Sequence, residues 1–213
     1  MKEDIIDNYK KLPIGKYLEI CQLCNEEMEA LDRQVKVIAI LTDNTEEEVL
    51  NAPLMTYTHW REKSEFIFNP SKGDHSRIAD VYKIGGFDLV PVKDLRKVTT
   101  GQYVDYQKYL EDKENNIVEI LSVFLIPKGK TYCNDYDVID VQEAIRENLS
   151  THEVLSLLAF FLTSYQGLIL SSLTYSEKMA KGISNKGKRE KILEKIRQQM
   201  AFLSGGDGSQ MLM

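Results

Sequence analysis

The sequence predicts a mainly α-helical (α+β) protein that carries one small β-hairpin. Three observations lead to this fold class. Hydrophobic residues make up 43% of the 213 residues and charged residues 28%, which is the composition of a folded globular protein. Apolar residues recur at helical spacing through most of the chain. In residues 77–91, apolar and polar residues instead alternate on both sides of Gly85 and Gly86. Two glycines between such alternating runs indicate a hairpin turn.

The first part of the chain is predicted to form a series of helices. Their expected ranges are 13–28, 31–42, 45–51 and 54–67. Thr45 and Glu48 have the spacing of a capping box, in which each residue satisfies a backbone N–H of the other, so a helix should begin there. Pro53 and Pro70 are expected to end the third and fourth helices, because the residue before a proline disfavours the helical conformation.

Helical spacing returns after the hairpin, which must pack on helices or pair with another edge to be stable. The expected ranges are 100–110, 115–125, 138–147 and a long helix from 150 to 181, followed by a basic helix at 188–202. Residues 154–173 approach the length of a membrane span, but Ser, Thr and Gln interrupt them. We therefore expect a buried core helix and no membrane partner.

These elements suggest four regions. They are an N-terminal helical unit (1–70), a β-hairpin insert (71–93), a C-terminal helical unit with the buried apolar helix (94–182), and a basic helix with a flexible tail (183–213). Residues 14–19 (IGKYLE) and 100–105 (TGQYVD) match in chemical type, and each precedes an apolar helix. The match suggests a duplicated helix–loop–helix unit, with coincidence as the alternative.

Charge and cysteine content restrict the functional classes. The net charge of −6 and the pI of about 5.2 argue against general nucleic-acid binding, which relies on cations. The first seven residues lack the pattern of a secretory signal, and the three cysteines give no disulfide framework. We therefore expect a reducing, cytosolic compartment.

The motif Cys21-Gln-Leu-Cys24 is the first candidate for chemistry. Zinc would need four ligands, and the only other cysteine is the distant Cys133. A redox pair would sit at the start of a helix after a strand, whereas this pair lies within a predicted helix. The sequence therefore favours core packing for both cysteines.

The other residues able to perform catalysis are scattered. His59, His75 and His152 stand singly, without a nucleophile motif. The carboxylates after residue 134 lack the glycine and the glutamate spacing of a calcium loop, and residues 182–188 lack the order of a phosphate loop. We therefore expect a non-enzymatic protein without catalytic, cofactor or metal sites.

A basic segment near the C-terminus is the strongest candidate for binding. Residues 177–198 hold eight Lys and Arg against three Glu, a net charge of +5, and their apolar residues fall on one edge of a helix. The alternatives are docking to an acidic partner or to the acidic body of the chain, contact with nucleic acid, and a solvated face. The predicted partner-binding residues are Lys186, Lys188, Arg189, Lys191, Lys195 and Arg197.

Three segments resemble a family of tailed-bacteriophage proteins described as tail assembly chaperones or virion morphogenesis proteins. They are PIGKYLEI, IAILTDNTEEEVLNAPL and VTTGQYVDYQKYLEDKENNIVEILSVFLIPKGKTY. The shared features are the helix start at 101–105, the segment 125–132 and the aromatic-apolar run at 158–162. The resemblance covers about residues 12–173 and excludes the basic segment.

The resemblance implies a non-enzymatic assembly protein in the host cytoplasm or the virion. Such a protein binds a tail or other virion component, such as a tape-measure-like client, during morphogenesis, and self-association is plausible. The alternative is a structural or packaged virion protein whose basic helix contacts DNA or an acidic neighbour. A hydrolase or nuclease would need clustered Asp, Glu and His residues, and the sequence shows no such cluster.

Overall fold

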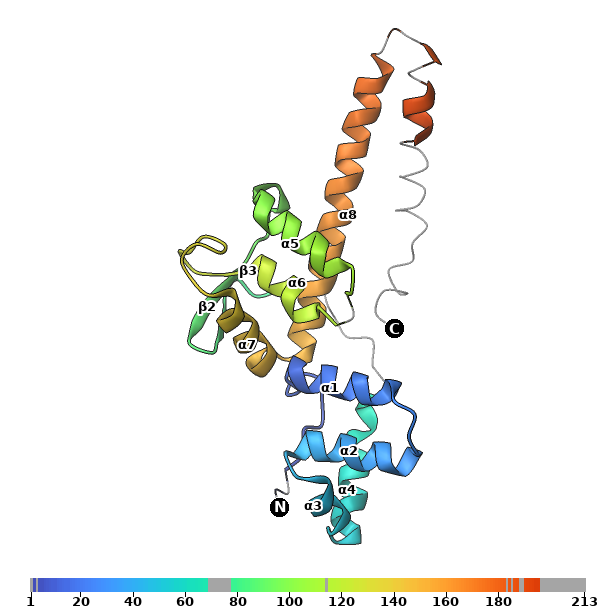
Figure 1. Cartoon of the computed structure of the whole chain (residues 1–213), viewed down its shortest axis with the longest axis vertical. Coiled ribbons are helices and arrows are strands. Elements are labelled where there is room, and N and C mark those ends of the chain that lie inside the picture. Colours follow the sequence, from blue (N-terminus) through green and yellow to red (C-terminus); the bar gives the residue numbers. More distant parts are fainter. Residues whose placement is uncertain are drawn as a thin grey trace. The chain divides into compact units, whose positions relative to one another are not determined.

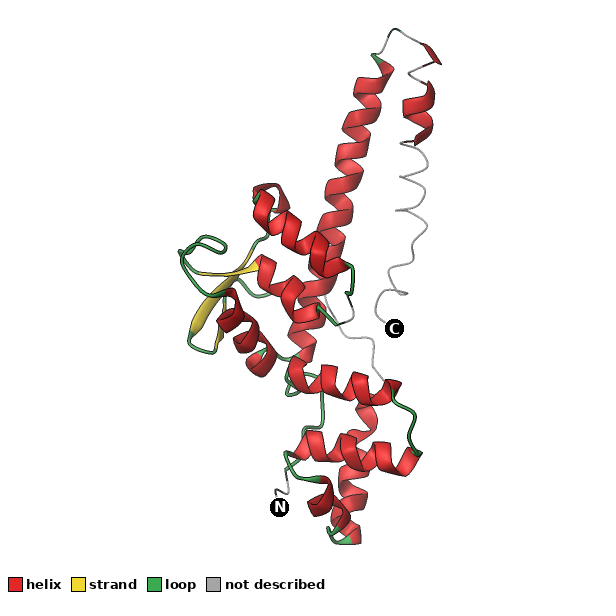
Figure 2. Cartoon of the chain, viewed as in Figure 1, coloured by secondary structure: helices red, strands yellow, loops and turns green. Residues whose placement is uncertain are grey.

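The computed structural model of the chain describes residues 2, 4–68, 78–113, 115–182, 184, 186, 187 and 190–195. Over these residues the fold is mainly helical with one small antiparallel sheet, which confirms the predicted fold class (Figures 1 and 2). The chain divides into two compact units. The first comprises residues 1–93 and 97–159, and the second comprises residues 94–96 and 160–213.

The first unit begins with helices packed around α2. Their bounds are α1 Ile14–Asn25, α2 Ala30–Thr42, α3 Glu46–Leu50 and α4 Leu54–Ser64, which continues as a 3-10 turn, η1 Glu65–Ile67. α2 contacts α1, α3 and α4. The predicted capping box is confirmed at α3, where Glu48 N–H donates to Thr45 Oγ1 at 3.2 Å and Thr45 N–H donates to Glu48 Oε2 at 2.8 Å.

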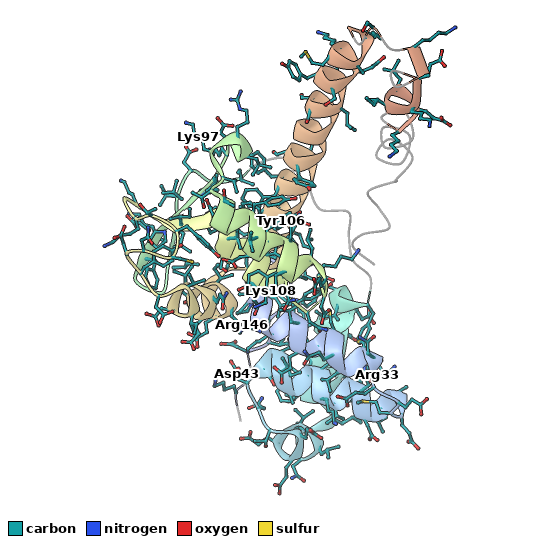
Figure 3. The ribbon with its side chains drawn as sticks, turned by 45° about the horizontal axis from the view of Figure 1, so that its top comes forward. Arg33, Asp43, Lys97, Tyr106, Lys108 and Arg146 are labelled. Carbon is teal, nitrogen blue, oxygen red and sulfur yellow. The ribbon has the colours of Figure 1, made fainter. Side chains whose placement is uncertain are left out.

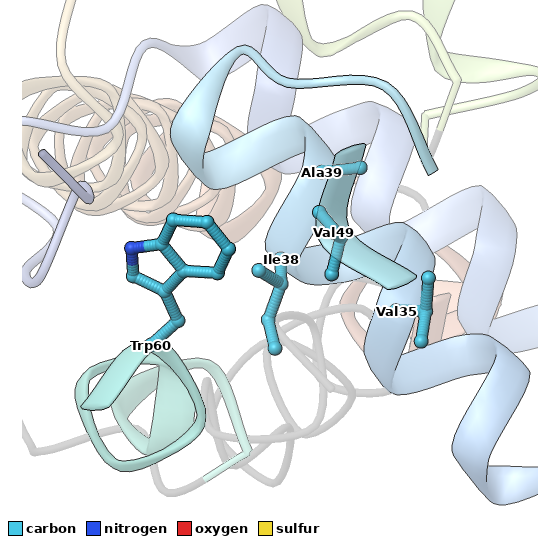
Figure 4. Packing of buried hydrophobic residues seen from close by; sticks show 5 residues of the cluster. All are labelled: Val35, Ile38, Ala39, Val49 and Trp60. Atoms are coloured by element: carbon cyan, nitrogen blue, oxygen red, sulfur yellow. The ribbon is translucent and has the colours of Figure 1, made fainter. Parts of the chain in front are cut away.

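α2 is central because it buries apolar side chains on two faces. On one face Ile38 and neighbouring side chains pack with Val49 and with the fully buried Trp60 (Figure 4). On the other face Val37 and Leu41 pack in a second cluster with residues of α1 and of the N-terminal segment. A helix that is apolar on most of its circumference is stable only inside such an arrangement.

The predicted hairpin is confirmed, and it belongs to a larger sheet. β1 (Tyr82–Ile84) pairs antiparallel with β2 (Phe87–Pro91), and both turn residues, Gly85 and Gly86, have the positive φ of a two-residue hairpin turn. A third strand, β3 (Leu125–Pro127), pairs with β2. β3 was not predicted from the sequence, because Leu125 was expected to end the preceding helix. As an edge strand, β3 tolerates a proline.

The rest of the first unit consists of helices that support this sheet. Their bounds are α5 Thr100–Leu110, α6 Ile117–Phe124 and α7 Val138–Asn148. α6 packs between α5 and α7 and is almost entirely buried. α7 lies so close to the hairpin turn that a Cβ on Gly85 would be 2.5 Å from the Cβ of Ala144. Gly85 is therefore required both for its φ and for this close approach.

The two ends of the first unit are joined by backbone hydrogen bonds. Ile14 N–H, the first of α1, donates to Leu149 O at 2.9 Å, and Thr151 N–H donates to Leu12 O at 2.7 Å. Beside this contact, a Cβ on Gly15 would be 2.8 Å from the carbonyl oxygen of Arg146. Residues 12–15 therefore lie directly against the end of α7 and the start of α8.

The long helix α8 spans Thr151–Lys181, close to the predicted range of 150 to 181, and Ser150 and Glu153 form a capping pair at its start. Val154, Leu157 and Phe161 are buried. From Thr163 onward, most side chains that the structure describes are exposed or half-buried. The expected core helix is therefore found only over about residues 151–161, because polar residues follow. Among the described residues, no helix has the length and apolarity needed to cross a membrane.

The second unit comprises residues 94–96 and the part of α8 from Phe160 onward, and residues 190–195 are helical within it. This division differs from the four regions suggested by the sequence. The hairpin assigned to an insert at 71–93 shares a sheet with β3, which lies in the region assigned to 94–182. The suggested boundary between residues 70 and 71 lies outside the described residues.

Candidate protein-binding surface

The cysteine pair lies near the end of α1. Cys21 is half-buried, and Cys24 is exposed, so the expectation that both cysteines pack in the core is wrong for Cys24. Both thiols are free. Burial raises the pKa of the Cys21 thiol, which makes it less reactive than an exposed thiol.

The histidines and carboxylates singled out in the sequence are separated in the structure. His59 is exposed on α4 and His152 is half-buried in the first turn of α8, while His75 lies outside the described residues. Asp137 caps α7 by accepting the N–H of Ile139 at 2.9 Å. In the part of the chain that the structure describes, no group of three or more His, Cys, Asp or Glu is arranged to hold a metal ion.

Three of the predicted partner-binding residues are described. Lys186, Lys191 and Lys195 are exposed, and the last two belong to the helical residues 190–195. The other three predicted residues, Lys188, Arg189 and Arg197, lie outside the described residues. Their role in binding stays a prediction.

An open groove of about 440 Å³ lies between α1 and α2 and extends to the start of α3. Its lining residues are Lys16, Glu19, Leu23, Lys36, Ala39, Ile40, Asp43, Asn44, Thr45 and Glu46. Apolar side chains from both helices therefore lie between charged groups of both signs. This groove was not predicted from the sequence, because its lining is assembled from two helices and a loop.

Lys16 and Asp43 hold the end of α2 at one side of this groove. Lys16 Nζ donates to Ile40 O at 2.9 Å and to Asp43 Oδ1 at 2.5 Å. Asp43 follows α2 in a left-handed conformation, with φ of 54° (labelled in Figure 3). The hydrogen bond from Lys16 lowers the pKa of the Asp43 carboxyl. This pair therefore has a structural role, and Glu19, Lys36 and Glu46 carry the remaining charges of the groove.

A second surface lies at the turn between α3 and α4. Leu50 is 68% exposed, Leu54 78% and Met55 87%. We call these three residues, with the exposed Glu46 and Glu47 of α3, the α3–α4 patch. Glu46 belongs both to the α3–α4 patch and to the groove, so the two surfaces adjoin.

The loop after β3 holds tyrosines of two kinds. Tyr132 OH donates to Asp105 Oδ2 at 2.9 Å, whereas the buried Tyr136 OH has no hydrogen-bond partner among the described residues. Burial raises the pKa of both phenols, that of Tyr136 to about 12. Both phenols therefore stay protonated at neutral pH, and the two tyrosines have a packing role rather than an acid–base role.

Comparison of the chain with protein-family models, with curated proteins and with solved structures finds no match.

Proposed function

We propose that this chain is a non-enzymatic protein of bacteriophage assembly, which binds a tail or other virion component through the groove between α1 and α2. Two things support the proposal. Residues 12–173 resemble the tail assembly chaperone family. Leu23, Ala39 and Ile40 form an apolar strip within an otherwise charged and polar groove, which suits an amphipathic helix that carries charges of its own. The groove is the observation that carries the proposal.

Binding would follow the helix-in-groove mode. Apolar side chains of the client, spaced three and four residues apart, would pack on Leu23 and Ile40. Glu19 and Lys36 come from different helices and have opposite charge, so they would set the direction of the bound helix. Such binding covers an apolar client surface that would otherwise aggregate, which is the task of an assembly chaperone.

The host cytoplasm is the compartment in which this binding would take place, with the virion as the alternative location. A structural or packaged virion protein is the second candidate function. The exposed Lys186, Lys191 and Lys195 favour it, because a basic helix suits DNA or an acidic neighbour.

Affinity purification of the tagged chain from producing cells, with mass spectrometry of its partners, tests both candidates. The chaperone function predicts recovery of a long helical tail protein and absence of the chain from purified particles. The structural function predicts recovery of portal, capsid or tail-tube subunits and presence of the chain in particles. Recovery of metabolic enzymes alone would contradict both.

A groove variant makes the test specific. Glu19→Lys combined with Lys36→Glu leaves the net charge unchanged and reverses these two of the groove charges, so recovery of the client should fall at least about fivefold. The control is Lys128→Glu with Glu147→Lys, which makes the same exchange at exposed positions outside the groove. Equal recovery with both variants would exclude the groove as the binding site.

A further inference from the structure

The α3–α4 patch is held facing outward by buried neighbours on the same helices. Val49, next to Leu50, is buried against α2, and so is Trp60 of α4. Tyr57 OH also donates to Gln34 Oε1 of α2 at 3.1 Å. Because these contacts fix the rotation of α3 and α4, Leu50, Leu54 and Met55 cannot turn into the core. They form an apolar surface of the kind that marks an interaction site.

Along the chain, the charged side chains beside this surface are acidic, and Asp43 among them is already paired with Lys16 and Lys2. Between residues 43 and 60 the charged side chains are Asp43, Glu46, Glu47 and Glu48, and the first cation after them is Arg61. Glu46 and Glu47 are exposed on the helix that carries Leu50. An apolar surface bordered by carboxylates is complementary to a basic amphipathic helix, because such a helix supplies apolar contacts and cations together.

The chain itself contains a segment with this chemistry. Residues 186–197 hold six Lys and Arg against two Glu. In the described part, Lys191 and Lys195 are exposed, while Ile192 and Leu193 between them are half-buried. The segment therefore combines cations with apolar side chains, as an occupant of the patch requires.

We propose that the α3–α4 patch of one copy binds the basic segment 186–197 of a second copy, so that two copies exchange these segments in a symmetric dimer. A single contact on three apolar side chains is small beside the roughly 1,000 Å² of a stable interface. Reciprocal exchange provides the contact twice, which favours a closed pair. The inference does not rest on the phage assembly function.

Sedimentation velocity of the full chain tests the dimer. The wild-type chain should sediment at twice the monomer mass at micromolar concentration and dissociate as salt rises, because the contact is partly ionic. Glu46→Lys with Glu47→Lys reverses the charge of the patch, and Lys191→Glu with Lys195→Glu reverses the charge at two lysines of the segment, which lowers its net charge from +4 to zero. Each double variant should weaken the dimer roughly tenfold or more. Glu26→Lys with Glu27→Lys, on the exposed loop before α2, is the matched control and should remain dimeric.

Mixing the two double variants shows whether the contact is between copies. In the mixed dimer the substituted patch faces the substituted segment and the wild-type patch faces the wild-type segment. Opposite charges therefore meet again at positions 46, 47, 191 and 195, and the mixture should dimerise more strongly than either variant alone. A monomeric wild-type chain, or a mixture that stays monomeric, would overturn the proposal. Equal dimerisation of the wild type and both variants, or loss of the dimer after nuclease treatment, would also overturn it.

Discussion

The two helix–loop–helix segments, α1–α2 and α5–α6, make one contact in the same way. In each, the residue after the first glycine of the leading helix donates to a carbonyl near the end of the second helix. Lys16 Nζ donates to Ile40 O at 2.9 Å, and Gln102 Nε2 donates to Val123 O at 2.7 Å. The last four carbonyls of a helix have no partner within it, so each donor satisfies one of them.

The surroundings of the two donors differ. The Gln102 residue is 2% exposed, and its side chain also accepts the N–H of Thr99 to complete a capping box. The Lys16 side chain is 22% exposed and charged, and α1 begins after Pro13 without a side-chain cap. One arrangement is therefore held by a buried neutral amide and the other by a partly solvated cation. The duplication itself stays a hypothesis.

The largest difference between the two segments should appear when each donor side chain, Gln102 or Lys16, is replaced by alanine. Gln102→Ala leaves the buried Val123 carbonyl without a partner and removes the capping bond to the N–H of the exposed Thr99, so the free energy of unfolding should fall by about 2–3 kcal/mol. Lys16→Ala should lower it by less than about 1 kcal/mol, because water replaces a partly exposed donor. Urea denaturation followed by circular dichroism measures both. Equal losses of unfolding free energy in the two variants would show that the buried amide and the partly solvated cation contribute alike.

Replacing the first glycine of α1 or of α5 by alanine should change the stability of the protein in opposite directions. A Cβ on Gly15 would be 2.8 Å from both Cγ and O of Arg146, so Gly15→Ala should destabilise the fold by about 1–3 kcal/mol. A Cβ on Gly101 meets only Thr99 Oγ1, at 3.9 Å, so Gly101→Ala should stabilise α5 by up to about 1 kcal/mol. The midpoints of thermal unfolding should move in opposite directions. A loss of stability in both variants would show that Gly101 is also constrained.

Replacing the two tyrosines of the loop after β3 should change stability by smaller amounts. Tyr132→Phe removes a hydrogen bond to the Asp105 carboxylate and should cost about 1–2 kcal/mol. Tyr136→Phe removes a buried hydroxyl without a described partner and should be neutral or slightly stabilising. In a spectrophotometric titration, only Tyr136→Phe should lose a phenol transition near pH 12. Destabilisation by Tyr136→Phe would reveal a partner for its hydroxyl.

The smallest effect is the pH dependence of the Lys16–Asp43 pair. The pKa of Asp43 is lowered in the folded state, so its contribution is present above the ordinary value of 3.8 and is lost as pH falls through the folded-state pKa. The difference in stability between the wild type and Lys16→Met should therefore be below about 1 kcal/mol at pH 7 and shrink below pH 4. Chemical denaturation from pH 3 to pH 7 measures it. A difference that does not shrink as pH falls would assign the effect to the hydrogen bond with Ile40 or to packing of the lysine stem, and not to the Asp43 carboxylate.

Features set by neighbouring residues were predictable from the sequence. The Thr45–Glu48 capping box and the hairpin at Gly85-Gly86 are both found. The capping box of Thr99 and Gln102 has the same spacing, so the same rule finds it in the sequence. β3 was not predictable, because an apolar run becomes a strand here only by pairing with residues 89–91. The groove and the exposure of Cys24 likewise depend on how α1 packs, which its helical spacing alone does not determine.

The hydrogen bonds between Leu12 and Thr151 have a consequence for the timing of folding during synthesis. The two residues are 139 positions apart. At about 5–20 residues per second, the ribosome needs roughly 7–28 seconds to add that stretch. During this interval α1 lacks the carbonyl of Leu149 that receives its first N–H. The nascent N-terminal helices therefore wait, with the surface that faces α7 still uncovered, until the start of α8 has been made.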